Sequence, residues 1–358
     1  MNIKELAKRA GVSVGTVSNV LGNKGNVSAE YRMKVLEAAK QMGYEPKPRG
    51  YRHPPLIAIC AERQSTLSDH ELPPFNAEVT VSLLAAAEES EVDVVFYTGT
   101  RLAERRRDPK FYLSQPFDAL VAFFPHGDQF RETLKAVGEH RPVVVMFGGG
   151  FEGTVSGIKA RNYEIGRLAA NYLIGQGYKR FYYVPAPDEN EDSDERGKGF
   201  SDGITQESEA PVRLPKISGV KPKQEDDRYP PWGMEYAEAV GQDLRDYAAE
   251  EDSPVGVFVF ADPLGVDLLS WSSPDGKQPG RLGVPSKVGI IGCDDLNLGR
   301  GLLDKVGLTS IPQSVEDISR GAIQAALDLI AGAPKGRTET IAEKPKVDPR
   351  WSTERTRD

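Results

Sequence analysis

Few side chains in this 358-residue chain have types and spacings that suggest chemistry. The segment GGGFEG at 148–153 follows an apolar run and has the G-x-G-x-x-G spacing of a dinucleotide-binding turn. That motif needs a helix next and an acidic residue about 20 positions later. Here β-branched residues and Gly157 follow, and Tyr172 stands where the acid would be. We therefore predict a glycine turn, with a nucleotide-cofactor enzyme kept only as an alternative.

No catalytic pair or metal-binding spacing is visible elsewhere. Asp294 and Asp295 are adjacent, so their side chains diverge on any regular backbone. The two cysteines lie inside apolar runs and the four histidines are scattered: Cys60, Cys293, His53, His70, His126 and His140. This pattern favours buried free thiols over a disulfide or a metal site. We predict a protein that is not an enzyme and that has no metal or cofactor.

Composition is that of an ordinary soluble globular protein, with 39% hydrophobic and 27% charged residues. No stretch approaches 18 consecutive apolar residues, and the amino terminus lacks the apolar region of a secretory signal. We expect a cytoplasmic protein.

The net charge of −8 is divided unequally along the chain. Residues 1–53 carry a net charge of +6, and the remainder carries −14. A small basic segment on a large acidic body is expected when only that segment meets a polyanion.

Three short helices are predicted in the basic segment. Asn2 and Glu5 have capping-box spacing at the start of the first helix, and Gly11 ends it. Ser13 can cap a second helix with Val14, Val17 and Leu21 at helical spacing, and Ser28 can cap a third that ends at Gly43. Two short helices joined by a Gly-containing turn, with a third in support, form a helix-turn-helix.

The run IKELAKRAGVSVGTVSNVLGNKGNVSAEYRMKVLEAAKQMGY resembles the DNA-binding headpiece of the LacI/GalR (lactose-repressor) family. In such headpieces the second helix enters the major groove. The resemblance implies that base edges are contacted by Val14, Gly15 and Asn19. It implies phosphate contacts from the hydroxyl residues near the two helix starts, namely Ser13, Thr16, Ser18 and Ser28.

Asn19 stands where the family commonly has Arg. An Asn amide matches N6 and N7 of adenine, whereas Arg matches O6 and N7 of guanine. We predict that the base pair read by Asn19 is A·T. A solvated or phosphate-bound Asn19 is the alternative.

The linker EPKPRGYRHPP (45–55) is rich in proline, which excludes helix and favours extended backbone. Family members commonly have a short hinge helix here, with a Leu wedged into the minor groove. This linker is shorter and has no Leu before Leu56. Arg49, Tyr51 and Arg52 could enter a narrow minor groove instead, or lie near phosphates on a flexible tether.

Beyond the linker, apolar runs alternate with amphipathic stretches. The runs expected as buried strands are 56–60, 92–99, 117–124, 142–147, 180–186, 255–262 and 287–295. Alternating strands and helices over about 300 residues imply two parallel sheets. We predict an α/β fold: a three-helix headpiece and a body of two doubly wound lobes.

The family resemblance continues through NYEIGRLAANYLIGQGYKRFYYV, DERGKGFSDGI and VPSKVGIIGCDDLNLG. It implies a periplasmic-binding-protein-like body with three crossovers and a ligand between two lobes, and a final strand at RWST (350–353). The expected domains are a DNA-binding domain (1–46), a linker (47–56) and an effector-binding domain (57–358). Its first lobe would comprise 57–157 and 311–333, and its second 158–310 and 334–358.

Effector contacts follow from the same resemblance and from the position of strand ends. Arg196 and Asp294 match effector-contacting residues of the family and suit hydroxyl groups. Trp232 is placed to stack on a sugar face, and Phe75 and Asp262 are further candidates. Each has a structural alternative: an ion pair for Arg196, helix capping for the two acids, and core packing for the two aromatic residues.

Together these features predict a homodimeric transcriptional regulator, expected to be a repressor, that binds a palindromic operator and is controlled by a sugar or sugar derivative. The alternatives are a sugar-binding protein with a vestigial headpiece and the nucleotide-cofactor enzyme above. The sequence shows no carboxy-terminal heptad repeat, which disfavours a coiled-coil tetramer.

Overall fold

The computed structural model describes residues 2–22, 27–44, 54–61, 74–97, 108–123, 128–151, 153–187, 190–208, 210–216, 233–273, 280–295 and 306–354. Contacts divide the chain into two units. Unit 1 comprises Met1–Ser68, Ser82–Lys159 and Ile318–Thr340, and unit 2 comprises Asp69–Val81, Ala160–Asp317 and Ile341–Asp358. The chain therefore changes unit after residues 159, 317 and 340, where the sequence analysis expects changes after 157, 310 and 333. Residues 69–81, expected in the first lobe, group with unit 2.

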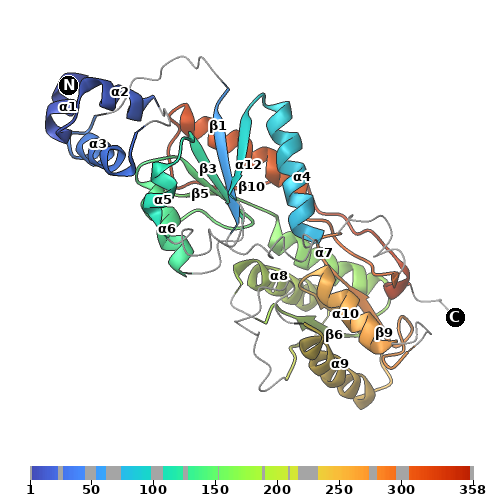
Figure 1. The fold of residues 1–358 in the computed structure, drawn as a ribbon. Helices are drawn as coiled ribbons and strands as arrows, with labels where there is room; N and C mark the ends of the chain where they lie inside the picture. The colour runs from blue at the N-terminus through green and yellow to red at the C-terminus, as the bar shows by residue number, and fades with distance from the viewer. Residues whose placement is uncertain are drawn as a thin grey trace. The chain divides into compact units, whose positions relative to one another are not determined.

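Three helices form the amino-terminal headpiece of unit 1 (Figure 1): α1 (Ile3–Ala10), α2 (Val14–Leu21) and α3 (Ala29–Gln41). Asn2 accepts a hydrogen bond from the Glu5 amide, and the Glu5 carboxylate accepts one from the Asn2 amide, which confirms the capping box. Ser13 caps α2 and Ser28 caps α3, as predicted. Gly11 ends α1 with φ +65°, a conformation that glycine adopts without steric cost. The buried core of the headpiece consists of Leu6, Ala7, Ala10, Val17, Val20, Val35, Ala38 and Ala39.

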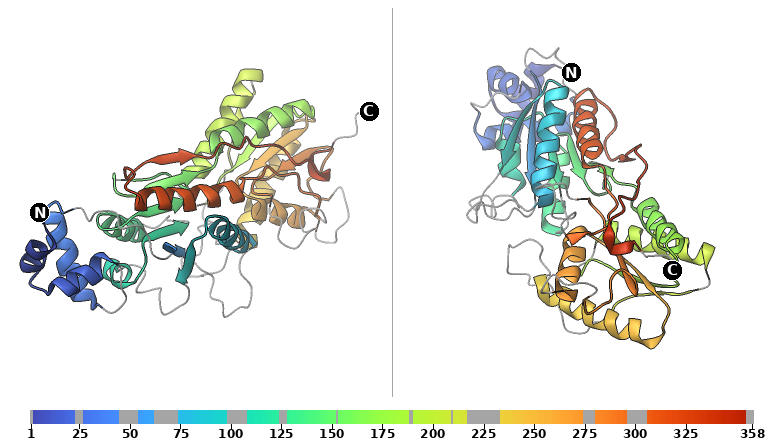
Figure 2. Two further views of the ribbon diagram at one scale, coloured as in Figure 1. Left: turned by 90° about the horizontal axis from the view of Figure 1, so that it is seen from above. Right: turned by 90° about the vertical axis from the view of Figure 1, so that its right-hand side faces the viewer.

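A six-stranded parallel sheet forms the rest of unit 1, in the order β10-β5-β4-β3-β1-β2. Its strands are β1 (Leu56–Ala61), β2 (Asp93–Tyr97), β3 (Ala119–Phe123), β4 (Val143–Met146), β5 (Ser156–Lys159) and β10 (Thr338–Thr340). Helices α5 (Pro109–Ser114) and α6 (Asp128–Gly138) pack on one face, and α4 (Pro74–Glu89) and α12 (Val315–Ile330) cover the other (Figures 1 and 2). Because both faces are covered, β3 and β4 are apolar and buried along their whole length.

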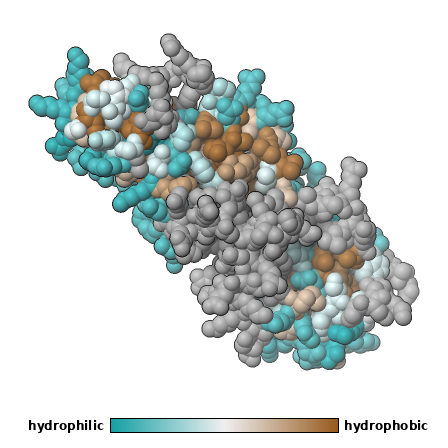
Figure 3. Space-filling model, viewed as in Figure 1, coloured by the Kyte–Doolittle hydropathy of each residue, from teal (hydrophilic) through white to brown (hydrophobic). Residues whose placement is uncertain are grey.

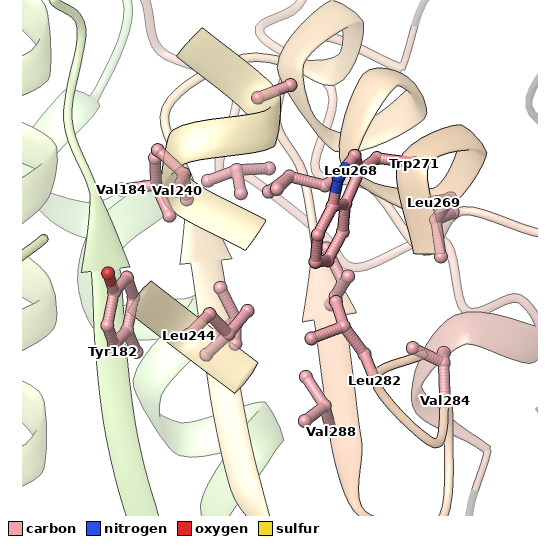
Figure 4. Packing of buried hydrophobic residues seen from close by; sticks show 14 of the residues in the cluster. Tyr182, Val184, Val240, Leu244, Leu268, Leu269, Trp271, Leu282, Val284 and Val288 are labelled. Carbon is pink, nitrogen blue, oxygen red and sulfur yellow. The ribbon is translucent and has the colours of Figure 1, made fainter. Parts of the chain in front are cut away.

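A second parallel sheet forms the centre of unit 2, in the order β7-β6-β8-β9. Its strands are β6 (Arg180–Val184), β7 (Val212–Arg213), β8 (Val255–Val259) and β9 (Val288–Ile291). Figure 4 shows one face of this sheet, where Tyr182 and Val184 pack with residues of α9 (Gly233–Glu250) and α10 (Asp262–Ser272). Phe181 and Tyr183 alternate to the other face and contact the Phe200 ring of α8 (Glu191–Glu207). The α/β fold with two parallel sheets is therefore confirmed.

Helices α7 (Asn162–Gly175) and α8 pack closely because glycine lines their contact. A Cβ at Gly166 would lie 2.0 Å from the carbonyl oxygen of Arg196, and one at Gly199 would lie 2.0 Å from that of Tyr163. No side chain fits at such distances, so these glycines set the position of α8. Since α8 carries Arg196, they also place a candidate effector residue.

The expected strand at 350–353 is wrong. Residues Trp351–Thr353 form a short 3-10 helix. The Ser352 hydroxyl accepts from the Thr309 amide (2.8 Å) and donates to the Ile290 carbonyl (2.6 Å). A side chain thus satisfies backbone groups that another strand would have paired. Strands β5, β7 and β10 were not expected from the sequence, since each is short or broken by glycine.

Candidate functional site

The amino-terminal turn of α2 carries most of the expected DNA-contacting residues. The Ser13 hydroxyl accepts from the Thr16 amide (3.0 Å) and lies 2.9 Å from the Thr16 hydroxyl, so the two side chains hold one another. Val14 is 42% exposed, whereas Val17 and Val20 are buried in the headpiece core. Gly15 is also exposed, and no acidic residue occupies this first turn. Apolar and hydroxyl groups are therefore exposed to solvent at the amino terminus of α2, which is the positive end of the helix dipole.

The remaining expected DNA contacts lie at the sides of this surface. Ser18 and Asn19 are half-buried on α2. Ser28 is exposed at the start of α3, where its hydroxyl accepts from the Tyr31 amide at 3.4 Å. The linker residues Arg49 and Arg52 lie outside the described residues.

A second polar cluster lies in unit 2, where Arg196 is 1% exposed on α8. Its Nε donates to Asn162 Oδ1 at 2.9 Å, and its Nη1 donates to the Phe260 carbonyl oxygen at 2.7 Å. The same Nη1 is 3.8 Å from Asp294 Oδ1. Sequence alone suggested an ion pair with the acidic run 191–195; that run instead reaches Arg196 through Asn162, whose amide donates to Asp192 at 2.7 Å.

The two candidate acids follow neighbouring strands of the second sheet. Asp262, after β8, is fully buried and accepts from the Ser310 hydroxyl at 2.7 Å. Asp294, after β9, is 5% exposed and accepts from the side-chain amide of Gln313. Because β8 and β9 are parallel neighbours, their carboxyl ends bring both acids to one edge of the sheet.

The opposite charges of Arg196 and Asp294 partly offset the cost of burying each of them. Burial raises the pKa of Asp294 to about 6, against the opposing influence of the Arg196 guanidinium. Burial also works against ionised Arg196, but the neighbouring Cys293, Asp294 and Asp192 outweigh it and raise the Arg196 pKa. At neutral pH both Arg196 and Asp294 are therefore ionised.

Strained backbone angles occur just after strands β4 and β9. Phe147 follows β4 with φ +56°, and Asp294 and Asp295 follow β9 with φ +115° and +48°. Positive φ angles cost conformational free energy in residues other than glycine, and sites that bind ligands commonly contain them.

Two of the expected effector residues are less informative. Phe75 is buried in the first turn of α4, in a stretch that groups with unit 2. Trp232 lies outside the described residues. Asn162, Ser310 and Gln313 were not predicted as members of the cluster, because polar residues from two distant segments carry no shared spacing.

The glycine segment 148–151 is followed by strand β5, not by a helix. Gly150 donates its amide to the Thr338 hydroxyl at 2.8 Å, and a Cβ at Gly157 would lie 2.3 Å from the Gly150 nitrogen. These glycines allow backbone segments to pack closely, which accounts for the motif without a pyrophosphate site.

Comparison with known proteins identifies both parts of the chain. A model described as bacterial regulatory proteins, lacI family, matches residues 2–47, and one described as periplasmic binding protein-like domain matches residues 170–353. The chain belongs to the lacI family. The repressor PurR of Edwardsiella ictaluri is 25% identical over 357 residues, covering 98% of this chain and 96% of that protein. The regulator CelR of Thermobifida fusca is 24% identical over 338 residues, covering 92% of each.

Solved structures agree with this fold. The complex of the regulator CelR with cellobiose has a TM-score of 0.63 at 23% identity, covering 98% of this chain and 99% of that one. The lac repressor dimer bound to operator and the anti-inducer ONPF has a TM-score of 0.57 at 17% identity, covering 99% of each chain. This lacI-family chain is thus a DNA-binding transcriptional regulator, and its relatives are regulators too.

None of the helices in the described residues combines the length and apolar character that crossing a bilayer requires. In the same part of the chain, no group of three or more His, Cys, Asp or Glu side chains is placed to hold a metal ion. Cys60 and Cys293 are both buried, and neither is part of a disulfide.

Proposed function

We propose that this lacI-family protein is a homodimeric repressor that reads a palindromic operator with α2. The observation that carries the proposal is the exposed first turn of α2, with its paired Ser13 and Thr16 hydroxyls and exposed Val14. Val14, Gly15 and Asn19 would meet base edges, and Ser13, Thr16, Ser18 and Ser28 would bind phosphates. The net charge of +6 on residues 1–53 supports this assignment.

Selection from a random DNA pool by the full chain tests this proposal. We expect a palindrome to be enriched, with binding that weakens steeply as salt increases, because phosphate contacts release counterions. The control is a Val14→Glu variant, which places a carboxylate on the exposed first turn without touching the headpiece core. Equal enrichment by the variant, or none by the parent chain with or without ligand, would leave a ligand-binding protein with a vestigial headpiece as the better account.

We further propose that the effector binds at the carboxyl edge of the second sheet, on Arg196, Asp262 and Asp294. Two carboxylates and one guanidinium in a buried cluster suit a neutral ligand rich in hydroxyl groups, since acids accept and Arg donates. The internal hydrogen bonds from Gln313 and Ser310 keep the acids satisfied until a ligand replaces them. That the related CelR has been solved with cellobiose supports a sugar or sugar derivative. Phe75 and Trp232 remain proposed contacts to the effector. The linker residues Arg49 and Arg52 remain proposed contacts to DNA.

Calorimetric titration with mono- and disaccharides, with nucleobases as a second panel, tests this site. We expect a sugar to bind and Arg196→Met to weaken binding at least a hundredfold, since the variant removes the guanidinium donor and the cation beside Asp294. The matched control is Arg213→Met, which removes an Arg of the same lobe whose Nη2 lies 3.3 Å from Asp243. Binding of nucleobases alone would overturn the sugar assignment, and equal loss in both variants would overturn the site.

The homodimer is proposed to form through α4. Val81 and Leu84 of this helix are 63% and 46% exposed, among the largest exposures of apolar side chains in the described residues. Figure 3 shows apolar residues gathered over the part of the surface that α4 occupies. A large exposed apolar surface indicates a protein contact, and two-fold pairing matches palindromic DNA.

A further inference from the structure

Helix α3 has a second surface besides its contact with α1 and α2. Met33 and Leu36 are partly buried against the apolar cluster of the first lobe, which includes Tyr112 and Leu113 of α5. Leu36 also packs on the headpiece core, whereas Met33 packs on the lobe cluster alone. The headpiece thus contacts the body of its own unit directly, besides its covalent connection through the linker.

Charged groups surround this apolar contact. Lys40 Nζ of α3 lies 2.6 Å from Glu139 Oε2, just after α6. His140 is next to that carboxylate; burial lowers its pKa, Lys40 and Lys335 lower it further, and Glu139 and Glu37 oppose them. At the other end, a groove of about 330 Å³ is lined by Lys110 of α5 and by Glu30, Met33, Lys34 and Glu37 of α3. Acidic residues of α3 thus face a lysine of the lobe, and a lysine of α3 faces a glutamate of the lobe.

One feature weakens the contact. Arg32 of α3 is fully buried. Burial lowers the pKa of Arg141 to about 10, and the positive charge of Arg32 contributes to this decrease. Arg141 belongs to the lobe, where it donates to the carbonyl oxygens of Leu113 (3.3 Å) and Gln115 (3.0 Å) at the end of α5. Two like charges therefore face each other across the contact, and the Lys40–Glu139 pair is 56% and 39% exposed, so it adds little. A contact of this kind can form and separate.

The contact leaves the DNA-reading surface open. Ser13, Val14 and Gly15 are exposed while Met33 and Leu36 are partly covered. None of the α3 residues that meet the lobe is among the expected DNA contacts. Docking and DNA binding therefore use different surfaces of the headpiece.

We propose that α3 is a coupling surface: it docks the headpiece on α5 and α6 of its own first lobe, and ligand binding acts on DNA affinity through this contact. The Pro-rich linker lacks the leucine that a minor-groove wedge needs, so a direct contact supplies the coupling that a hinge helix would otherwise provide. A change in the first lobe that moves α5 or α6 changes where the headpiece is held, and hence the spacing of two headpieces on an operator.

The docking itself is tested without DNA or ligand, by backbone amide relaxation and hydrogen exchange on the full chain. In the parent protein we expect headpiece amides to tumble with the body. Met33→Glu should release the headpiece, with at least a twofold fall in its rotational correlation time and faster exchange at residues 109–114. Lys40→Glu should give a partial release that Lys40→Glu with Glu139→Lys reverses, because the charge pair is restored in the opposite sense. The matched controls are Lys8→Glu, an exposed residue of α1, and Glu132→Lys, an exposed residue of α6.

Either of two results would overturn docking: parent headpiece amides that already tumble independently, or a Met33→Glu variant that tumbles like the parent. Headpiece amide chemical shifts separate release from unfolding, since Met33 does not pack on the headpiece core.

The coupling role rests on the proposed function and has its own readout. In Met33→Glu we expect operator affinity to persist while its change on adding effector falls at least fivefold. An unchanged effector response in a variant shown to be released would overturn coupling while docking stands. Absence of any effector response in the parent protein would count against the proposed function instead, and leave the relaxation result to decide docking.

Discussion

The side chain of Asn19 is half-buried on α2, between exposed Gly15 and the headpiece core. Its amide can both donate and accept, which is the pattern that adenine offers in the major groove. A guanidinium at the same position would offer only donors, which match guanine. We therefore propose that Asn19 sets the base preference at one half-site position.

We predict that Asn19→Arg changes the preferred base pair at that position from A·T to G·C, with about 1–3 kcal/mol of discrimination. Selection from a random DNA pool with both proteins would measure it. Ser18→Ala is the control, because it removes a proposed phosphate contact and should weaken binding without altering the preferred sequence. An unchanged preferred sequence in Asn19→Arg would show that Asn19 does not read a base.

Asp267 of α10 shows how one residue makes stability depend on pH. Burial raises its pKa to about 6. In the unfolded chain an Asp titrates near 3.9, so the folded protein binds more protons between about pH 4 and 6. Stability from this group is therefore greatest below pH 4 and is lost as pH rises through 6.

We predict that Asp267→Asn stabilises unit 2 at pH 7, by about 1 kcal/mol, and has little effect at pH 4.5. Denaturant unfolding at the two pH values would measure the difference. The control is Asp252→Asn, the same substitution at an exposed position of the same unit. A pH slope in Asp267→Asn equal to that of the parent would contradict the prediction.

At the scale of elements, the α7–α8 contact links packing to the effector site. Gly166 allows α8 to approach until the Arg196 carbonyl lies where a Cβ would be. Any side chain there must push α8 away, and Arg196 moves with it. The hydrogen bond from Arg196 to Asn162 of α7 crosses this same contact.

We predict that Gly166→Ala destabilises unit 2 by about 1–3 kcal/mol, the usual cost of overpacking, and also weakens effector binding. Gly175→Ala at the end of α7 is the control, because a Cβ there meets nothing within 4 Å. Urea unfolding and calorimetric titration of both variants would test the two effects. If Gly166→Ala were as stable as Gly175→Ala, the close approach of α8 would not be a constraint.

At the scale of the whole molecule, the proposed regulation needs two chains on one operator. We propose the exposed face of α4 as the pairing surface and the contact of α3 with the first lobe as the path to each headpiece. The contact of α3 lies within unit 1, whereas Arg196 and Asp294 belong to unit 2.

We predict that Leu84→Glu combined with Val81→Glu weakens dimerisation at least a hundredfold, because four charges would be buried in a two-fold contact. Sedimentation velocity over a range of concentrations would measure this. The control is Leu214→Glu, which charges a leucine of unit 2 that is 56% exposed and should leave the dimer intact. A dimer that persists in the α4 double variant would exclude α4 as the pairing surface.

Local signals in the sequence were sufficient for the headpiece. The caps at Asn2, Ser13 and Ser28 depend on residues at most three positions away, so spacing alone predicts them. The buried strands were equally clear, since both faces of each sheet are covered and apolar runs result.

The sequence by itself determined the family, the α/β fold and the residue types that could bind DNA or a ligand. Only the tertiary structure decided which of them meet. Asn162, Ser310 and Gln313 join Arg196 and the two acids because parallel strands end at one edge and two glycines hold α8 against α7. The 3-10 helix at Trp351–Thr353 and the docking of α3 likewise depend on groups far away in the chain. Local spacing encodes caps and faces, whereas burial of charges and contacts between distant segments exist only once the chain has folded.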